Sequence, residues 1–164
     1  MTATTRPAPP QPLKAILGGG LVVAVFDGVN ATTFWGLFRG TEPHVIFQSI
    51  AAGLLGESAF TGGITAAWLG AFLHLLIACG VAAVFYIGCR IWPGMLGRVV
   101  TCGLIYGAVV YLVMNHVVVP LSRARPAPFN TAWFLDNFLG HLFLVGLPVA
   151  LVARLSVPES RPVA

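Results

Sequence analysis

Long apolar runs broken by short polar stretches dominate the pattern of this chain. Four of these runs cover residues 16–38, 64–87, 99–121 and 133–154. A helix that crosses a lipid bilayer needs about 20 mostly apolar residues, and each run meets that length. We therefore predict an all-α membrane protein in which four transmembrane helices form a bundle.

A fifth apolar stretch, residues 45–56, is too short to cross a bilayer. Its length favours a short helix that is either re-entrant or interfacial, and the sequence leaves both alternatives open. The Pro-rich residues 1–13 predict a disordered N-terminal tail, and residues 156–164 predict a C-terminal tail. Residues 14–155 then form a single four-span membrane domain.

The composition is typical of a membrane protein, whose main partner is the lipid bilayer. Hydrophobic residues make up 57% of the 164 residues and charged residues only 9%, whereas soluble domains carry about 25% charged residues. The net charge of +4 does not indicate nucleic-acid binding, because the basic residues lie at the ends of the apolar runs.

The basic residues also predict an orientation, because cytoplasmic loops carry an excess of Lys and Arg. One side of the predicted bundle receives six of them: Arg6, Lys14, Arg90, Arg98, Arg154 and Arg161. The opposite side receives three: Arg39, Arg123 and Arg125. Both termini are therefore expected in the cytoplasm.

Small residues recur at helical spacing in the apolar runs and predict close helix contacts, since small side chains let helices approach in lipid. The first run contains the series Gly20, Ala24 and Gly28, and the third contains the pair Gly103 and Gly107. The second run contains a stripe with period four: Ala66, Gly70, His74 and Ala78. In the fourth run, Pro148 predicts a kink near Leu144 because proline cannot donate a backbone hydrogen bond.

Polar side chains lie at membrane depth in every predicted span. A charge at the bilayer centre costs at least about 2.5 kcal/mol, so such groups usually face the interior of a bundle and mark function. The candidates for binding a ligand or a proton are Asp27, Asn30, His74, Asn115, His116, Asn137 and His141. We expect Asp27 and His141 to belong to one buried polar centre between the first and last spans.

An acid with several histidines could relay protons or hold Zn²⁺ or another transition metal. No single span has the spacing of a metal motif, so a site would need side chains from several helices. Alternatively, each polar group only makes an interhelical hydrogen bond that supports packing. The familiar catalytic motifs are missing, and the sequence names no catalytic residue and no cofactor.

Several short motifs in the second half are shared with one family: His74-Leu75-Leu76, Tyr86 with Trp92-Pro93, Asn115-His116 with Pro120-Leu121, and Asn137 with Gly140-His141-Leu142. Over residues 73–154 the chain resembles the YagU-like family of uncharacterised bacterial inner-membrane proteins. The resemblance implies a helical bundle in the bacterial cytoplasmic membrane and brings no activity with it.

Three functions follow from these observations. The first is proton-linked handling or transport of a small solute or ion at the Asp/His centre. The second is a structural or accessory subunit that packs against a partner membrane protein, and the third is a membrane metalloenzyme. Four spans are few for a transporter that works alone, so a homo-oligomer or a partner protein is expected for the first two.

Overall fold

The computed structural model describes residues 9–125 and 129–158, and its regular structure in these two segments is entirely helical. Four helices are long and apolar enough to cross a membrane: Lys14–Arg39, Gly63–Ile91, Val99–Leu121 and Thr131–Leu155. A short additional helix lies between the first two. The predicted all-α fold is therefore confirmed, and the largest difference in bounds is at the end of the second long helix, predicted at residue 87 and observed at Ile91.

The long helices are each interrupted or extended by short turns of tighter or wider helix. In chain order the elements are a π-helical turn Lys14–Gly18, α1 Gly19–Arg39, α2 Pro43–Leu55, a 3₁₀ helix Gly56–Thr61, α3 Gly63–Ile91, a 3₁₀ helix Pro93–Gly97, α4 Val99–Val113, a π-helical turn Met114–Val118, α5 Val119–Leu121, α6 Thr131–Gly140, a π-helical turn His141–Gly146 and α7 Leu147–Leu155.

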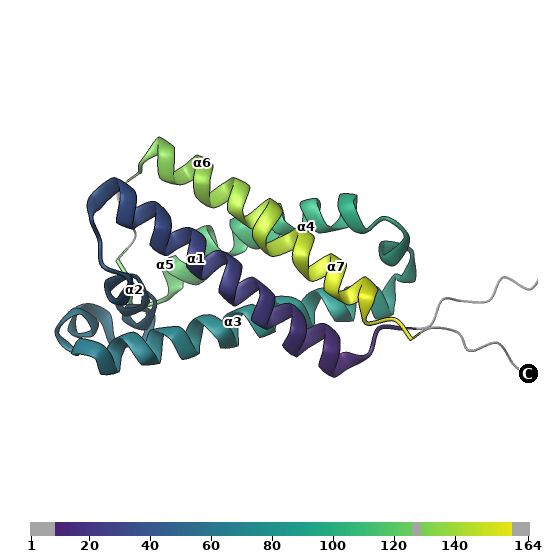
Figure 1. The fold of residues 1–164 in the computed structure, drawn as a ribbon, viewed down its shortest axis with the longest axis horizontal. Helices are drawn as coiled ribbons and strands as arrows, with labels where there is room; N and C mark the ends of the chain where they lie inside the picture. Colours follow the sequence, from purple (N-terminus) through teal and green to yellow (C-terminus); the bar gives the residue numbers. More distant parts are fainter. Residues whose placement is uncertain (1–8, 126–128, 159–164) are drawn as a thin grey trace, which may run out of the picture.

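The long helices run up and down the long axis of the molecule, and both described chain ends lie at the same end of the bundle (Figure 1). We call this the terminal end, and the opposite end, which carries α2, the α2 end. At the terminal end the amide of Gln11 donates to the carbonyl oxygen of Ser156 at 2.8 Å. Residues 9–13 were predicted to belong to the disordered N-terminal tail, and this bond fixes part of them against the end of the last helix. The tail predictions for residues 1–8 and 159–164 fall outside the described residues.

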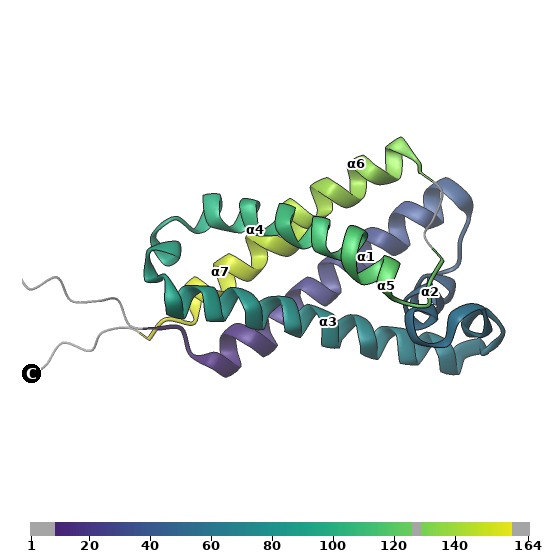
Figure 2. The ribbon, with the colours of Figure 1, turned by 180° about the vertical axis from the view of Figure 1, so that it is seen from behind.

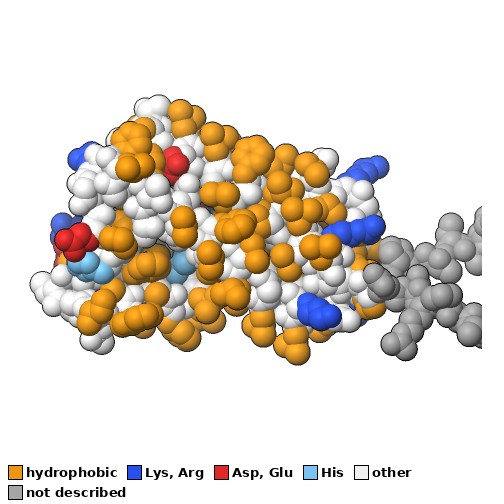
Figure 3. Space-filling view, in the orientation of Figure 1, with side chains coloured by type: hydrophobic (Ala, Val, Ile, Leu, Met, Phe, Trp, Pro, Cys, Tyr) orange, Lys and Arg blue, Asp and Glu red, His pale blue; other side chains and the backbone are white. Residues whose placement is uncertain are grey.

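Hydrophobic side chains cover the middle of the visible face, and Lys and Arg side chains gather towards its two ends (Figure 3). Many of the large apolar side chains are exposed, among them Leu21, Leu76, Ile105 and Phe143. Lipid favours such a surface and water does not. The surface therefore agrees with four helices placed in a membrane.

Glycines bring the long helices together where the sequence predicted close contacts. A methyl group added at Gly20 would overlap the side chain and backbone of Cys79 on α3. One added at Gly107 would overlap the backbone of His141 and Leu142. These two crossings, α1 on α3 and α4 on the fourth long helix, exclude any larger residue unless the backbone shifts.

The short helix α2 is fixed on the start of α3. A methyl group at Gly70 would overlap the carbonyl group of Phe47, so the two backbones touch. The buried side chain of Gln48 donates to the carbonyl oxygen of Gly63 at 2.9 Å. In the two views of the ribbon α2 is foreshortened, so its axis runs across the bundle (Figures 1 and 2). It thus covers part of the α2 end.

The segment that follows α5, residues 122–125, is hydrogen-bonded to the C-terminal end of α2. The amide of Arg123 donates to the carbonyl oxygen of Gly53 at 3.0 Å, and its guanidinium donates to that of Leu54 at 3.2 Å. These bonds satisfy carbonyl groups in the last turn of α2, where no helical partner exists. Arg125 and Glu57 add an exposed ion pair at 3.0 Å.

Two π-helical turns directly precede prolines in the third and fourth long helices. In each case the residue before the proline donates its amide hydrogen to a carbonyl group five residues earlier: Val119 to Met114, and Leu147 to Leu142. Proline lacks this hydrogen, which disturbs the regular helical pattern around it. The distortion predicted near Leu144 therefore takes the form of a widened turn.

Candidate functional site

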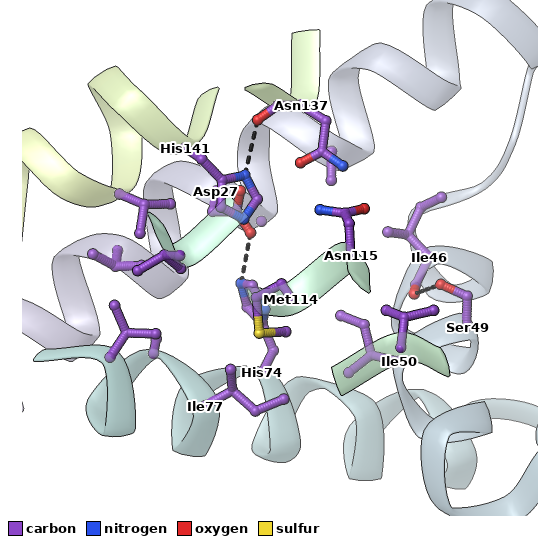
Figure 4. A pocket seen from close by; sticks show the side chains of 18 of the residues that line it. Asp27, Ile46, Ser49, Ile50, His74, Ile77, Met114, Asn115, Asn137 and His141 are labelled. Carbon is purple, nitrogen blue, oxygen red and sulfur yellow. Dashed lines mark hydrogen bonds and ion pairs between the residues drawn. The ribbon is translucent and has the colours of Figure 1, made fainter. Parts of the chain in front are cut away.

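A cavity of about 250 Å³ lies among the four long helices and α2. Because α2 contributes to its wall, the cavity belongs to the half of the bundle nearest the α2 end. Its polar lining consists of Asp27, Ser49, His74, Asn115, Asn137 and His141 (Figure 4). Every long helix supplies at least one of these side chains.

Five of the seven predicted site residues thus line one cavity: Asp27, His74, Asn115, Asn137 and His141. The other two do not line it. Asn30 lies on α1 but donates a hydrogen bond to Asp136 of α6, and His116 is exposed on the outer surface of the bundle. The ligand-binding role of the seven residues stays a prediction, because the structure shows their placement only.

Asp27 and His74 approach each other from α1 and α3. The Oδ2 of Asp27 lies 3.8 Å from the Nε2 of His74, and their side chains are 26% and 15% exposed. The same Nε2 lies 3.1 Å from the carbonyl oxygen of Ala24, to which it donates a hydrogen bond. Gly28 lies beside the imidazole, and a methyl group there would be in ordinary van der Waals contact with Nε2 at 3.5 Å.

His141 is fixed by its own helix. Its Nδ1 lies 2.8 Å from the carbonyl oxygen of Asn137 one turn earlier and donates a hydrogen bond to it. Among the described residues, the ion pair of Asp27 is formed with His74, and none joins Asp27 to His141. We expected Asp27 of the first span to meet His141 of the last span. The closest charged contact of Asp27 is instead with His74, on the second long helix.

Asn115 lies on the π-helical turn before Pro120 and its amide donates to the carbonyl oxygen of Tyr111 at 3.0 Å. The Tyr111 ring in turn meets the ring of His141 edge to face, with centroids 5.5 Å apart. The side chains of Asn115 and His141 therefore each bond back to a carbonyl group four residues earlier. These contacts hold Asn115 and His141 close to the cavity.

Aromatic rings line the cavity on the side of α1 and α6. The indole rings of Trp35 and Trp133 both belong to its wall, and their centroids are 5.1 Å apart. Phe34 packs against both of them. Since Trp35 and Trp133 lie near the ends of their helices, this aromatic cluster marks the part of the cavity nearest the α2 end.

Towards the terminal end, the cavity meets a packed apolar core. Val110 and Val145 line the cavity and also belong to this core, whose largest fully buried side chains include Phe85 and Val149. The hydroxyl group of Tyr106 crosses from α4 to donate to the carbonyl oxygen of Val81 at 2.6 Å. This packed core closes the cavity on the side of the terminal end, and we call it the floor of the cavity. A solute in the cavity could reach the terminal end only if these side chains moved apart.

The sequence analysis missed Asp136. Its Oδ2 accepts a hydrogen bond of 2.9 Å from the Nδ2 of Asn30, which links α6 to α1 beside the cavity. A signal was available: only two of the five acidic residues lie within the predicted spans, Asp27 and Asp136. By that criterion both should have been candidates.

No three His, Cys, Asp or Glu side chains of the described residues come together as a metal ion would require. A structural zinc site takes four such ligands and a catalytic one takes three. Asp27 and His74 are a pair without a third ligand, so this arrangement does not fit a metal site.

Comparison with protein families, with curated proteins and with solved structures gave no match to this chain. The resemblance to the YagU-like family therefore stays a prediction. The proposed function therefore rests on the polar side chains that line the cavity.

Proposed function

We propose that the protein is a multi-pass protein of a bacterial inner membrane that binds protons or a small solute in the cavity and handles them in a proton-linked manner. One observation carries this proposal. Polar side chains from four apolar helices, including an acid and two histidines, converge on a single cavity. Burying such groups in a membrane is costly, and a chain that keeps them usually uses them.

Asp27 and His74 supply the proton-binding groups. At 3.8 Å their facing atoms are too far apart for a direct hydrogen bond but close enough for a charge on one to affect the other. A proton taken up by His74 would create an ion pair with Asp27, and a cationic solute beside Asp27 would compete with that protonation. This competition is the physical basis for proton-linked binding.

Passage through the bundle would require the packed floor of the cavity to rearrange. The π-helical turns before Pro120 and Pro148 lie on the two helices that carry Asn115 and His141. Such turns occur often at functional sites, and proline-disturbed helices bend there most easily. We assign the movement that opens the floor to these two turns.

The proposed orientation places the terminal end in the cytoplasm. Lys14, Arg90, Arg98 and Arg154 lie at or near that end, as expected for cytoplasmic loops. The α2 end, with the aromatic cluster, then faces away from the cytoplasm. The bacterial inner membrane is the location that membership of the YagU-like family would imply.

Proton flux into liposomes that contain the purified protein and an enclosed pH-sensitive dye tests the proposal. We expect flux above that of empty liposomes, and we expect Asp27→Asn to reduce it at least tenfold. Glu57→Gln is the matched control, because Glu57 is an exposed acid that does not line the cavity. Equal flux from wild type and Asp27→Asn, together with a partner that co-purifies in stoichiometric amounts, would replace the proposal with the accessory-subunit function.

A further inference from the structure

The hydrogen bonds of the two cavity histidines determine what their neutral rings can offer a ligand. The Nε2 of His74 and the Nδ1 of His141 both contact backbone carbonyl oxygens, at 3.1 and 2.8 Å. A carbonyl oxygen only accepts, so the ring hydrogen must lie on these nitrogens. The second nitrogen of each neutral ring then carries a lone pair and is an acceptor.

The remaining polar groups, which also include Asn137 and Ser49, add further acceptors. An ionised Asp27 only accepts hydrogen bonds, and its facing partner His74 is beyond hydrogen-bond distance at 3.8 Å. Asn115 uses its amide as a donor to Tyr111, which leaves its carbonyl oxygen available. The cavity therefore favours a ligand that carries several donors.

The charge of the lining points to a cation. Asp27 is an acid, and neither Lys nor Arg is among the described residues that line the cavity. An anionic ligand would face a carboxylate without a counter-charge, whereas a cation would compensate it. A transition-metal ion would need three or more His, Cys, Asp or Glu ligands, and the described residues form no such group. A cation that carries its own hydrogen-bond donors suits the acceptor atoms of the cavity better.

The rest of the wall is apolar and aromatic. Ile46, Ile50, Ile77, Met114 and Val119 line it, together with the indole rings of Trp35 and Trp133. Indole rings attract cations through their faces, and aliphatic side chains favour an apolar body. At about 30 Å³ for each water-sized group, a volume of about 250 Å³ holds roughly eight such groups.

We infer that the solute bound in this cavity is a small organic cation of roughly eight non-hydrogen atoms, with a primary ammonium group on an apolar body. The three N–H groups of the ammonium donate to Asp27 and to two of the acceptor atoms that Asn115 and the histidines offer. The apolar body packs on the aliphatic and indole walls. This inference rests on the proposed function, since it names the solute class of the same site.

The test compares three probes of similar size and different charge: 2-phenylethylammonium, 2-phenylethanol and phenylacetate. Thermal unfolding of the full chain is followed in detergent at increasing concentrations of each, because a ligand of the folded state raises the unfolding temperature. We expect the ammonium probe to act at concentrations at least tenfold lower than the alcohol and the carboxylate. Asp27→Asn should remove the advantage of the ammonium over the alcohol, and Glu57→Gln should keep it.

Several results would overturn the inference, and they are separate from failure of the proposed function. Equal action of the alcohol and the ammonium would show a binding cavity without selectivity for cations, and the strongest action from phenylacetate would show an anion site. No action of the ammonium probe at millimolar concentration would also overturn it. The comparison of probes uses the wild-type chain, so the inference stays testable even if Asp27→Asn fails to fold, and proton flux into liposomes judges the proposed function on its own.

Discussion

The Nε2 of His74 lies close to two oxygens of α1, 3.1 Å from the carbonyl oxygen of Ala24 and 3.8 Å from the Oδ2 of Asp27. Figure 4 shows the side chains of His74 and Asp27 facing each other. The bond to the backbone holds the imidazole in place whatever its charge. The histidine therefore stays next to the acid in both protonation states, as a proton-linked site requires.

A double-mutant cycle should detect the contact between Asp27 and His74. Asp27→Asn and His74→Gln are each expected to lower the free energy of unfolding, and their combined effect should differ from the sum by about 0.5 kcal/mol or more, as for contacting residues. The cycle of Asp27→Asn with His141→Gln is the control and should give a smaller coupling. Thermal unfolding in detergent measures both, and a larger coupling for the control pair would contradict the geometry.

Close packing of α4 on the fourth long helix should make Gly107 intolerant of even a methyl group. Gly107→Ala forces the backbone of His141 and Leu142 away and should destabilise the fold by about 1–3 kcal/mol. Gly80→Ala is the matched control, because nothing lies within 4 Å of the place where its methyl group would be. Similar unfolding temperatures for the two variants would show that the helices do not cross at Gly107.

The hydrogen bond between Asn30 and Asp136 predicts a difference between two substitutions at one position. Asp136→Asn keeps an oxygen that can accept from Asn30, whereas Asp136→Leu removes it. Interhelical hydrogen bonds in membranes contribute about 0.6 kcal/mol on average and up to about 1.7 kcal/mol. We expect Asp136→Leu to be less stable than Asp136→Asn by an amount in this range. If the leucine variant unfolded at the same or a higher temperature, the bond would not contribute to stability.

Helix bounds and small-residue contacts could be predicted from the sequence because each depends on the residues of one segment. Length and hydropathy determine which segments can cross a bilayer, and a period of four places Gly70 and His74 on one face. Both of these residues lie on the face of α3 that packs on α1 and α2. Such patterns carry enough information for the fold class.

The partners of polar residues could not be predicted in the same way, since periodicity gives the direction of a side chain and not the identity of the neighbouring helix. Asn30 was grouped with Asp27, but it bonds to Asp136. Asn115 and His116 are adjacent and so differ by about 100° around the helix. The structure places Asn115 on the cavity wall, and His116 is exposed.

The proposed orientation can be checked with reporters fused at three points. Fusions after Phe60 and after Arg125 lie at the α2 end and should report a location outside the cytoplasm, and a fusion after Gly94 lies at the terminal end and should report the cytoplasm. The basic residues at the terminal end are the physical reason. The opposite pattern at all three points would invert the orientation. A cytoplasmic signal after Phe60 alone would mean that α2 crosses the membrane.

Filling the cavity tests most directly whether it is a binding site. Ala31 lines the cavity, so Ala31→Phe should occupy part of its volume, and Ala132→Phe on the exposed start of α6 is the control. The measurement is equilibrium binding of 2-phenylethylammonium to the purified proteins. The account predicts a folded Ala31→Phe variant whose affinity for the probe is at least tenfold lower than that of wild type, and an unchanged affinity for Ala132→Phe. Wild-type affinity in a folded Ala31→Phe variant would contradict the assignment of this cavity as the site.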